Sequence, residues 1–163
     1  MNFRKSWLLG ALLLSCVAHG ADGQLPWKKG DEAPAVAGIR LGDEREKIEK
    51  LLGEAPERKE LDNGALGLIY PQRGVAFVIG THGAGVALMY LMSPAAGDLD
   101  GVHWGDTRDV VLAHWGEPTL VQGAQAFYVV GSWNITVELG EGQQISVLSV
   151  GRASGELEQL LSE

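Results

Sequence analysis

The chain of 163 residues is poor in cysteine and in basic residues, and each shortage excludes a class of protein. Cys16 is its single cysteine, so an internal disulfide, a Cys-x-x-Cys redox pair and a thiolate metal site are all excluded. With 13 basic residues against 21 acidic ones, the net charge is −8, which disfavours nucleic acid as a partner. The folded part must therefore be an acidic domain held together by its apolar core.

Residues 1–20 have the pattern of a signal peptide. Arg4 and Lys5 precede an apolar run at 7–17 that is too short for a permanent membrane helix. Two processing routes are open: cleavage before Ala21, which the small residues Ala18 and Gly20 favour, or lipidation of Cys16 in a sequence like a bacterial lipobox. We expect an exported protein that resides in the periplasm. It would be associated with a membrane, as an outer-membrane lipoprotein, only if Cys16 is lipidated.

Catalytic and ligand-binding motifs are scarce as well. The four histidines do not stand at metal-ligand spacing, and no nucleophile lies in a recognisable catalytic motif. Asp43 and Asp106 open the first turns of predicted helices, where the helix dipole favours the ionised form and opposes a general acid. The sequence therefore predicts a protein that is not an enzyme and has no metal or cofactor.

What the chain does contain is a phrase that occurs twice, 63 residues apart. The first copy begins Gly38-Ile39-Arg40-Leu41-Gly42-Asp43 and the second Gly101-Val102-His103-Trp104-Gly105-Asp106, and both end in Gly-Glu before a proline. Recurrence at a fixed period indicates two copies of one supersecondary unit.

Each copy reads as a short helix followed by strands. Asp43 and Asp106 are predicted N-caps, and Gly53 and Gly116 predicted helix stops. Runs at 66–70, 75–79, 86–92, 126–130, 133–139 and 144–150 have strand character, with turn residues between them. These patterns predict an α+β fold in which two tandem α-β-β-β repeats form an antiparallel sheet with both helices on one face, plus a short C-terminal helix. The expected segments are a signal peptide (1–20), a tether (21–36), repeat 1 (37–94), repeat 2 (99–151) and the C-terminal helix (152–163).

The repeated phrase, followed by a tyrosine-bearing strand and hairpins, resembles the SmpA/OmlA-like module, whose relatives include a small outer-membrane lipoprotein and the tandem-repeat β-lactamase inhibitor proteins. The resemblance covers residues 37 to 151 and implies an exported, non-catalytic binding module of the cell envelope. The chain departs from the inhibitor proteins in lacking their disulfides, and from the lipoprotein in being duplicated.

The bulky aromatic residues supply the candidate binding site. The run at 86–92 is apolar at every position, which fits either a strand covered on both faces or an exposed patch that recruits a partner. Tyr128 and Tyr90, followed by Trp104 and Trp133, are the predicted protein-binding residues, because tyrosine and tryptophan dominate binding hot spots. We expect the partner to be another envelope protein, bound on an open sheet face for assembly or inhibition. A periplasmic small-ligand or lipid-binding protein is the alternative, and a small hydrolase the third hypothesis.

Overall fold

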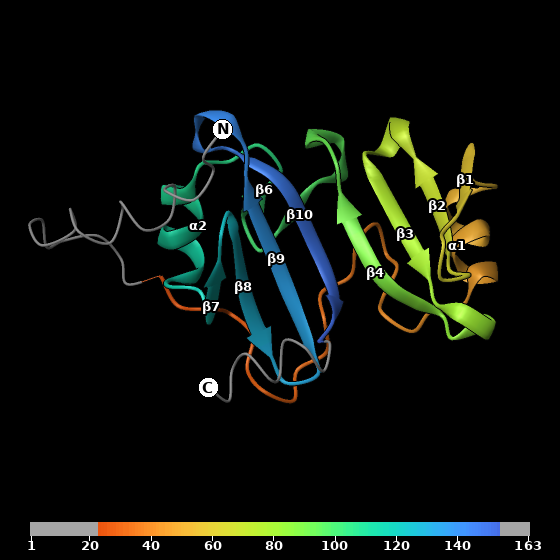
Figure 1. Ribbon diagram of the computed structural model, residues 1–163, viewed down its shortest axis with the longest axis horizontal. Coiled ribbons are helices and arrows are strands. Elements are labelled where there is room, and N and C mark those ends of the chain that lie inside the picture. The colour runs from red at the N-terminus through yellow and green to blue at the C-terminus, as the bar shows by residue number, and fades with distance from the viewer. Residues whose placement is uncertain (1–22, 154–163) are drawn as a thin grey trace, which may run out of the picture.

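The computed structural model describes residues 23–153, and its centre is one antiparallel sheet of eight strands in the order β1-β2-β3-β4-β10-β9-β8-β7 (Figure 1). The strands are β1 (Glu57–Glu60), β2 (Leu66–Tyr70), β3 (Val75–Ile79), β4 (Val86–Leu91), β7 (Leu120–Gln122), β8 (Gln125–Val130), β9 (Trp133–Leu139) and β10 (Ile145–Arg152). A separate two-stranded ribbon joins β5 (Asp98–Leu99) to β6 (Val102–His103), and the helices are α1 (Arg45–Leu52) and α2 (Arg108–Trp115). Single 3-10 turns lie at Pro71–Arg73, Thr81–Gly83, Pro94–Ala96 and Glu141–Gln143.

The predicted fold class is wrong. Residues 23–153 are predominantly β, and the two α-helices among them have eight residues each, so this is not an α+β fold of two tandem α-β-β-β repeats. Strands β1 and β7 form the two edges of the sheet and were not predicted. Neither edge strand alternates between buried and exposed residues: all four residues of β1 are exposed, and no residue of β7 is fully buried. The patterning that reveals a half-buried strand is therefore missing from both.

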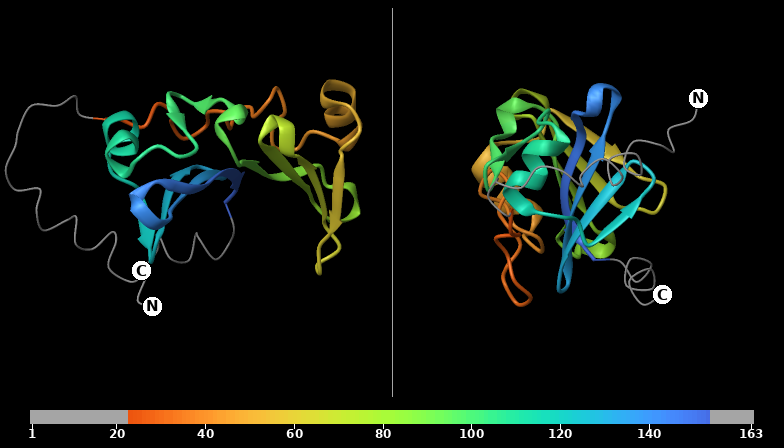
Figure 2. Two further views of the ribbon diagram at one scale, coloured as in Figure 1. Left: turned by 90° about the horizontal axis from the view of Figure 1, so that it is seen from above. Right: turned by 90° about the vertical axis from the view of Figure 1, so that its left-hand side faces the viewer.

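Both helices lie on the same side of the sheet, together with an N-terminal strap formed by residues 24–39 (Figure 2, left). Trp27 of this strap makes edge-to-face contacts with Trp115 and Trp133, at ring-centroid distances of 5.7 and 5.8 Å. Val36 and Ile39 are buried in the same core. The segment predicted as a tether (21–36) is therefore not a free linker where it is described: apolar residues without a helical or strand period fix it over the core.

The two copies of the repeated phrase build the same local contacts. In the first, the backbone N–H of Arg40 donates to the Asp43 carboxylate at 2.7 Å, and Val86 and Asp43 are joined by a backbone hydrogen bond of 2.8 Å. In the second, the N–H of His103 donates to Asp106 at 2.7 Å, and the N–H of Ile145 donates to the Asp106 carbonyl at 2.8 Å. Each phrase thus ties the entrance of a helix to a central strand, β4 or β10.

These contacts correct the predicted caps. The residues at the N-cap positions are Glu44 and Thr107, neither of which makes a side-chain cap hydrogen bond, while the two aspartates accept from N–H groups three residues before them. At the other helix ends, Gly53 and Gly116 stop the helices with φ of 85° and 72°, which favours glycine, and with ψ of 179° and −158°, which lie outside the left-handed helical region common at helix ends. The aspartates therefore stabilise a turn, and the glycines end the helices in an extended conformation.

Replacing Asp43 with alanine should lower the free energy of unfolding by about 1–2 kcal/mol, because its carboxylate accepts hydrogen bonds from the Arg40 N–H and from Lys47 Nζ at 2.7 Å. Burial raises the pKa of Asp43, but these hydrogen bonds and the charges of Lys47 and Arg40 outweigh it and hold the pKa of the carboxyl below its ordinary value. The stabilisation is thus present above the unfolded pKa and lost as pH falls through the folded pKa. Urea unfolding should be measured near pH 6 and below pH 3. Between these pH values the free energy of unfolding should fall less for Asp43→Ala than for wild type, and an equal fall in both proteins would contradict this account.

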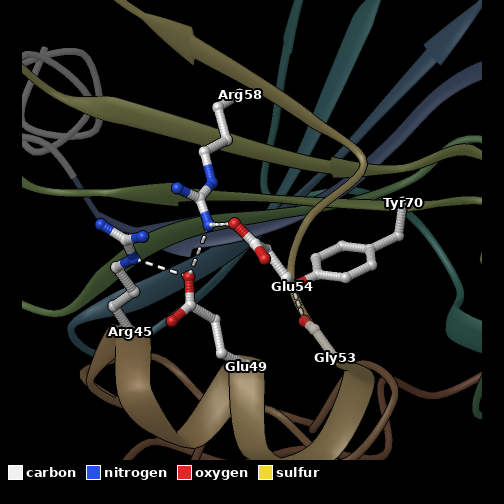
Figure 3. Close-up of polar contacts among 6 residues, drawn as sticks. All are labelled: Arg45, Glu49, Gly53, Glu54, Arg58 and Tyr70. Carbon is white, nitrogen blue, oxygen red and sulfur yellow. Dashed lines mark hydrogen bonds and ion pairs between the residues drawn. The ribbon is translucent and has the colours of Figure 1, made fainter.

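A cluster of charged side chains holds α1 against the edge strand β1 (Figure 3). Glu49 Oε1 lies 2.8 Å from Arg45 Nε and 3.2 Å from Arg58 Nη2, and the same Arg58 nitrogen lies 2.8 Å from Glu54 Oε1. Next to it, the Tyr70 hydroxyl donates to the Gly53 carbonyl at 2.8 Å, which joins β2 to the end of α1. The helix thereby positions β1 and β2, and these strands form one end of the candidate site.

Two of the predicted segments lie largely or wholly outside the described residues. The signal peptide (1–20) with Cys16 precedes them, and the C-terminal helix predicted for 152–163 is described only at Arg152, the last residue of β10, and Ala153. Within residues 23–153, no helix is long and apolar enough to cross a bilayer.

Candidate functional site: an apolar groove on the open sheet face

The sheet has two faces of different character, which the strand register separates. On the helix side, the register places Leu68, Phe77, Met89 and Val150 in one row, and all four are buried. The opposite face carries the row Ile69, Ala76, Tyr90, Ser149 and Thr136, because directly paired residues of antiparallel strands share a face. Neither helix nor the N-terminal strap covers this second face, which we call the open face (Figure 2).

A groove of about 360 Å³ lies on the open face of the N-terminal half. Its lining comes from β1 to β4, β10 and the loop before α2: Lys59, Leu61, Gly67, Ile69, Ala76, Phe77, Val78, Tyr90, Leu91, Met92, Trp104, Ser146 and Val147. The hollow has a simple cause, since Gly67 and Ala76 place minimal side chains on neighbouring strands where Ile69, Val78 and Tyr90 are larger. Lining of this composition suits an apolar ligand group.

Two of the predicted binding residues, Tyr90 and Trp104, line this groove although they are far apart in the sequence. Tyr90 is half-buried on β4, and burial raises the pKa of its phenol, so the group is neutral at physiological pH. The Trp104 indole N–H donates to the Ser146 carbonyl at 3.2 Å, which fixes the ring beside the start of β10. Both side chains thus offer a partner an aromatic surface, and Tyr90 adds a polar end.

The other two predicted binding residues lie in the core on the helix side. Tyr128 is 1% exposed, packs edge-to-face on Trp115 with a centroid distance of 5.4 Å, and donates its hydroxyl proton to the Gly116 carbonyl at 3.0 Å. Trp133 is 4% exposed and donates its indole N–H to the Asp31 carbonyl at 2.9 Å. Neither side chain belongs to the open face, so the structure separates these two from Tyr90 and Trp104.

The open face of the C-terminal half differs from the groove in being polar and internally hydrogen-bonded. Asn134 Nδ2 donates to the Thr136 hydroxyl at 3.0 Å, and Gln125 Nε2 donates to Glu138 Oε2 at 2.8 Å. The Ser146 hydroxyl donates to the Glu138 carbonyl at 3.2 Å. In this half the polar side chains bond to one another, and Asn134 is buried, whereas the groove presents apolar surface that lacks such partners.

Several groove residues were missed by reasoning from sequence alone, above all Ile69, Val78 and Lys59. Their strands were predicted, except β1, but alternation does not say which parity faces outward when both parities are apolar, as in Leu66–Tyr70 and Val75–Ile79. The useful signal was the small residues Gly67 and Ala76 within such strands, since a glycine inside a strand often marks a place where another molecule approaches closely.

The described residues hold no cluster of three or more His, Cys, Asp or Glu side chains that could bind a metal ion. A second hollow, of about 570 Å³, lies beside Arg40, Asp43, Ser132, Trp133 and Arg152 on the other side of the sheet. It mixes acidic and basic side chains, and Arg40 is engaged there by Glu32 at 3.3 Å and by the Ala33 carbonyl at 3.1 Å.

Comparison with known proteins identifies similar folds but no family. No family model matches the chain, and no curated protein matches it in sequence. A cysteine-rich secretory protein of Staphylococcus aureus has a similar structure, with a TM-score of 0.57 and 11% identity over 85% of this chain and 52% of that one. A DUF4309 family protein of Bacillus subtilis gives a TM-score of 0.54 and 14% identity over 75% of this chain and 88% of that one. This chain thus spans about half the length of the first protein, and the similarity to both lies in the fold.

Proposed function

We propose that this protein is an exported, non-catalytic binding module of the bacterial cell envelope, which holds an apolar segment of another envelope protein in the groove of its open face. The observation that carries the proposal is the groove itself: a hollow of about 360 Å³ on the open face, with an almost wholly apolar lining and two partly exposed aromatic side chains, Tyr90 and Trp104. Buried aromatic anchors surrounded by apolar contacts are typical of protein-binding hot spots.

Export is part of the proposal. It is supported by the signal-peptide pattern of residues 1–20 and agrees with the description of the S. aureus neighbour as a secretory protein. A periplasmic location, with or without an outer-membrane anchor through Cys16, is the finer proposal. The intact mass of protein exported from a native host tests it: a chain starting at Ala21 supports the soluble form, and a diacylglyceryl group on Cys16 the anchored one.

Replacing Tyr90 or Trp104 with alanine should weaken capture of the partner by at least about 2 kcal/mol, roughly thirtyfold in Kd, with little change in melting temperature. Both side chains are only partly buried and line the groove, so their loss removes contact area for the partner without opening the core. Phe127→Ala is the matched control, because Phe127 is a half-buried aromatic residue on the open face outside the groove lining. The experiment is a quantitative pull-down from envelope extract, and equal losses for all three variants would contradict a site in the groove.

A small apolar ligand is the second candidate occupant, favoured by the volume and apolar lining of the groove. Mass spectrometry of organic extracts from protein purified out of its native host distinguishes the two. A stoichiometric small molecule that the Tyr90→Ala variant loses would favour the ligand, and its absence alongside a captured protein would favour the binding module.

A further inference from the structure

We propose that the segment held in the groove carries a carboxylate, which pairs with Lys59; this inference rests on the proposed protein-binding function. Among the described residues that line the groove, Lys59 alone has a charged side chain. A cation beside an apolar hollow selects for a ligand in which a negative charge lies close to apolar groups.

Lys59 is placed for this role by the register of the edge strand. It is paired with Gly67, whose missing side chain leaves the space beside Lys59 empty on the open face. A methyl group added at Gly67 would lie 3.8 Å from Lys59 Cβ, so the lysine stem borders the hollow directly. The stem can then cover apolar surface while its ammonium group stays at the rim.

The ammonium group of Lys59 also differs from the neighbouring Arg58 guanidinium in having no ion-pair partner among the described side chains. Arg58, the preceding residue, lies on the helix side and is bound by Glu49 and Glu54. Lys59 makes no ion pair or hydrogen bond with another described side chain, although Glu57 shares its face two residues away. In a chain with a net charge of −8, an unpaired cation beside this apolar groove gives local complementarity to an acidic group.

The test uses octapeptides selected from a random phage-displayed library on the folded protein. The tightest groove-binding peptide is synthesised with its acidic residue and with the matching amide, Glu→Gln or Asp→Asn. Wild type should prefer the acidic peptide about tenfold in Kd, and Lys59→Met should remove that preference while still binding the amide peptide. Lys50→Met, on α1 and away from the groove, is the matched control and should keep the preference.

Each outcome decides the inference. An acidic preference that survives in Lys59→Met, or selected peptides without an acidic residue, would overturn it while leaving the proposed function intact. If no peptide binds, both the inference and the protein-binding function are wrong, and binding of dodecanoate but not of dodecanol would then show that the carboxylate belongs to a lipid.

Discussion

Replacing Tyr128 with alanine should lower the free energy of unfolding by about 3–5 kcal/mol, one of the largest single-residue effects expected in this protein. The ring is 1% exposed, and its contact with Trp115 links β8 to α2 within the core. The substitution would leave a large cavity between sheet and helix, and it would remove the hydrogen bond to the Gly116 carbonyl. Urea unfolding monitored by circular dichroism measures the change.

Tyr128→Phe separates the two contributions. It keeps the ring in place and removes only the hydroxyl, so we expect a loss of about 1 kcal/mol. If Tyr128→Ala unfolds at the same urea concentration as wild type but loses the partner, Tyr128 is a surface hot spot and its placement in the core is wrong.

Much of the sheet could be predicted from the sequence, because apolar runs separated by turn residues are typical of strands. Leu66–Tyr70, Val75–Ile79 and Trp133–Leu139 have the bounds that their patterns predict. The edges could not be read in this way. Glu57–Glu60 is a run of charged residues that becomes a strand because β2 offers it hydrogen bonds and α1 holds Arg58.

The aspartates show why the helix entrances were misread. A Gly-Asp pair before an amphipathic run has the pattern of an N-cap, but the carboxylates of Asp43 and Asp106 accept from N–H groups that precede them in the chain. Whether such an aspartate caps the helix or closes the turn before it depends on the backbone hydrogen bonds to Val86 and Ile145, which lie in strands far along the sequence. Local pattern alone does not contain that information.

Only two of the four predicted binding residues, Tyr90 and Trp104, line the groove, because the sequence does not show which face of a strand is open. Tyr90 and Tyr128 both lie in strands with apolar residues at both parities, so alternation does not show which of them faces outward. The register decides it, because Tyr128 is paired with Ile135 in the core on the helix side, whereas Tyr90 is paired with Ala76 and Ser149 in the row of the open face. Register is a property of the assembled sheet.

Filling the groove should abolish capture of the partner without unfolding the protein. Ala76→Leu adds three carbons on the open face of β3, between Ile69 and Tyr90, where they occupy the hollow that the partner's apolar group would fill. Gly67→Val does the same on β2, where an added Cβ would lie 3.4 Å from its nearest neighbour, the Lys59 carbonyl oxygen. A β-branched residue also suits an extended strand better than glycine, so Gly67→Val should match or exceed wild type in stability.

The matched control adds the same bulk to the open face away from the groove. Thr136→Leu on β9 places a leucine in the row that contains Ala76 and Tyr90, but on the polar half of the sheet. The control should capture the partner as well as wild type does.

The most direct test of the groove as the binding site is the Kd of the captured partner for Ala76→Leu and Gly67→Val beside wild type, measured by isothermal titration calorimetry on proteins of equal melting temperature. We predict that both groove-filling variants bind at least about thirtyfold more weakly and Thr136→Leu binds like wild type. Unchanged affinity in both filled variants would contradict the account, because it would show that the partner is bound elsewhere on the molecule.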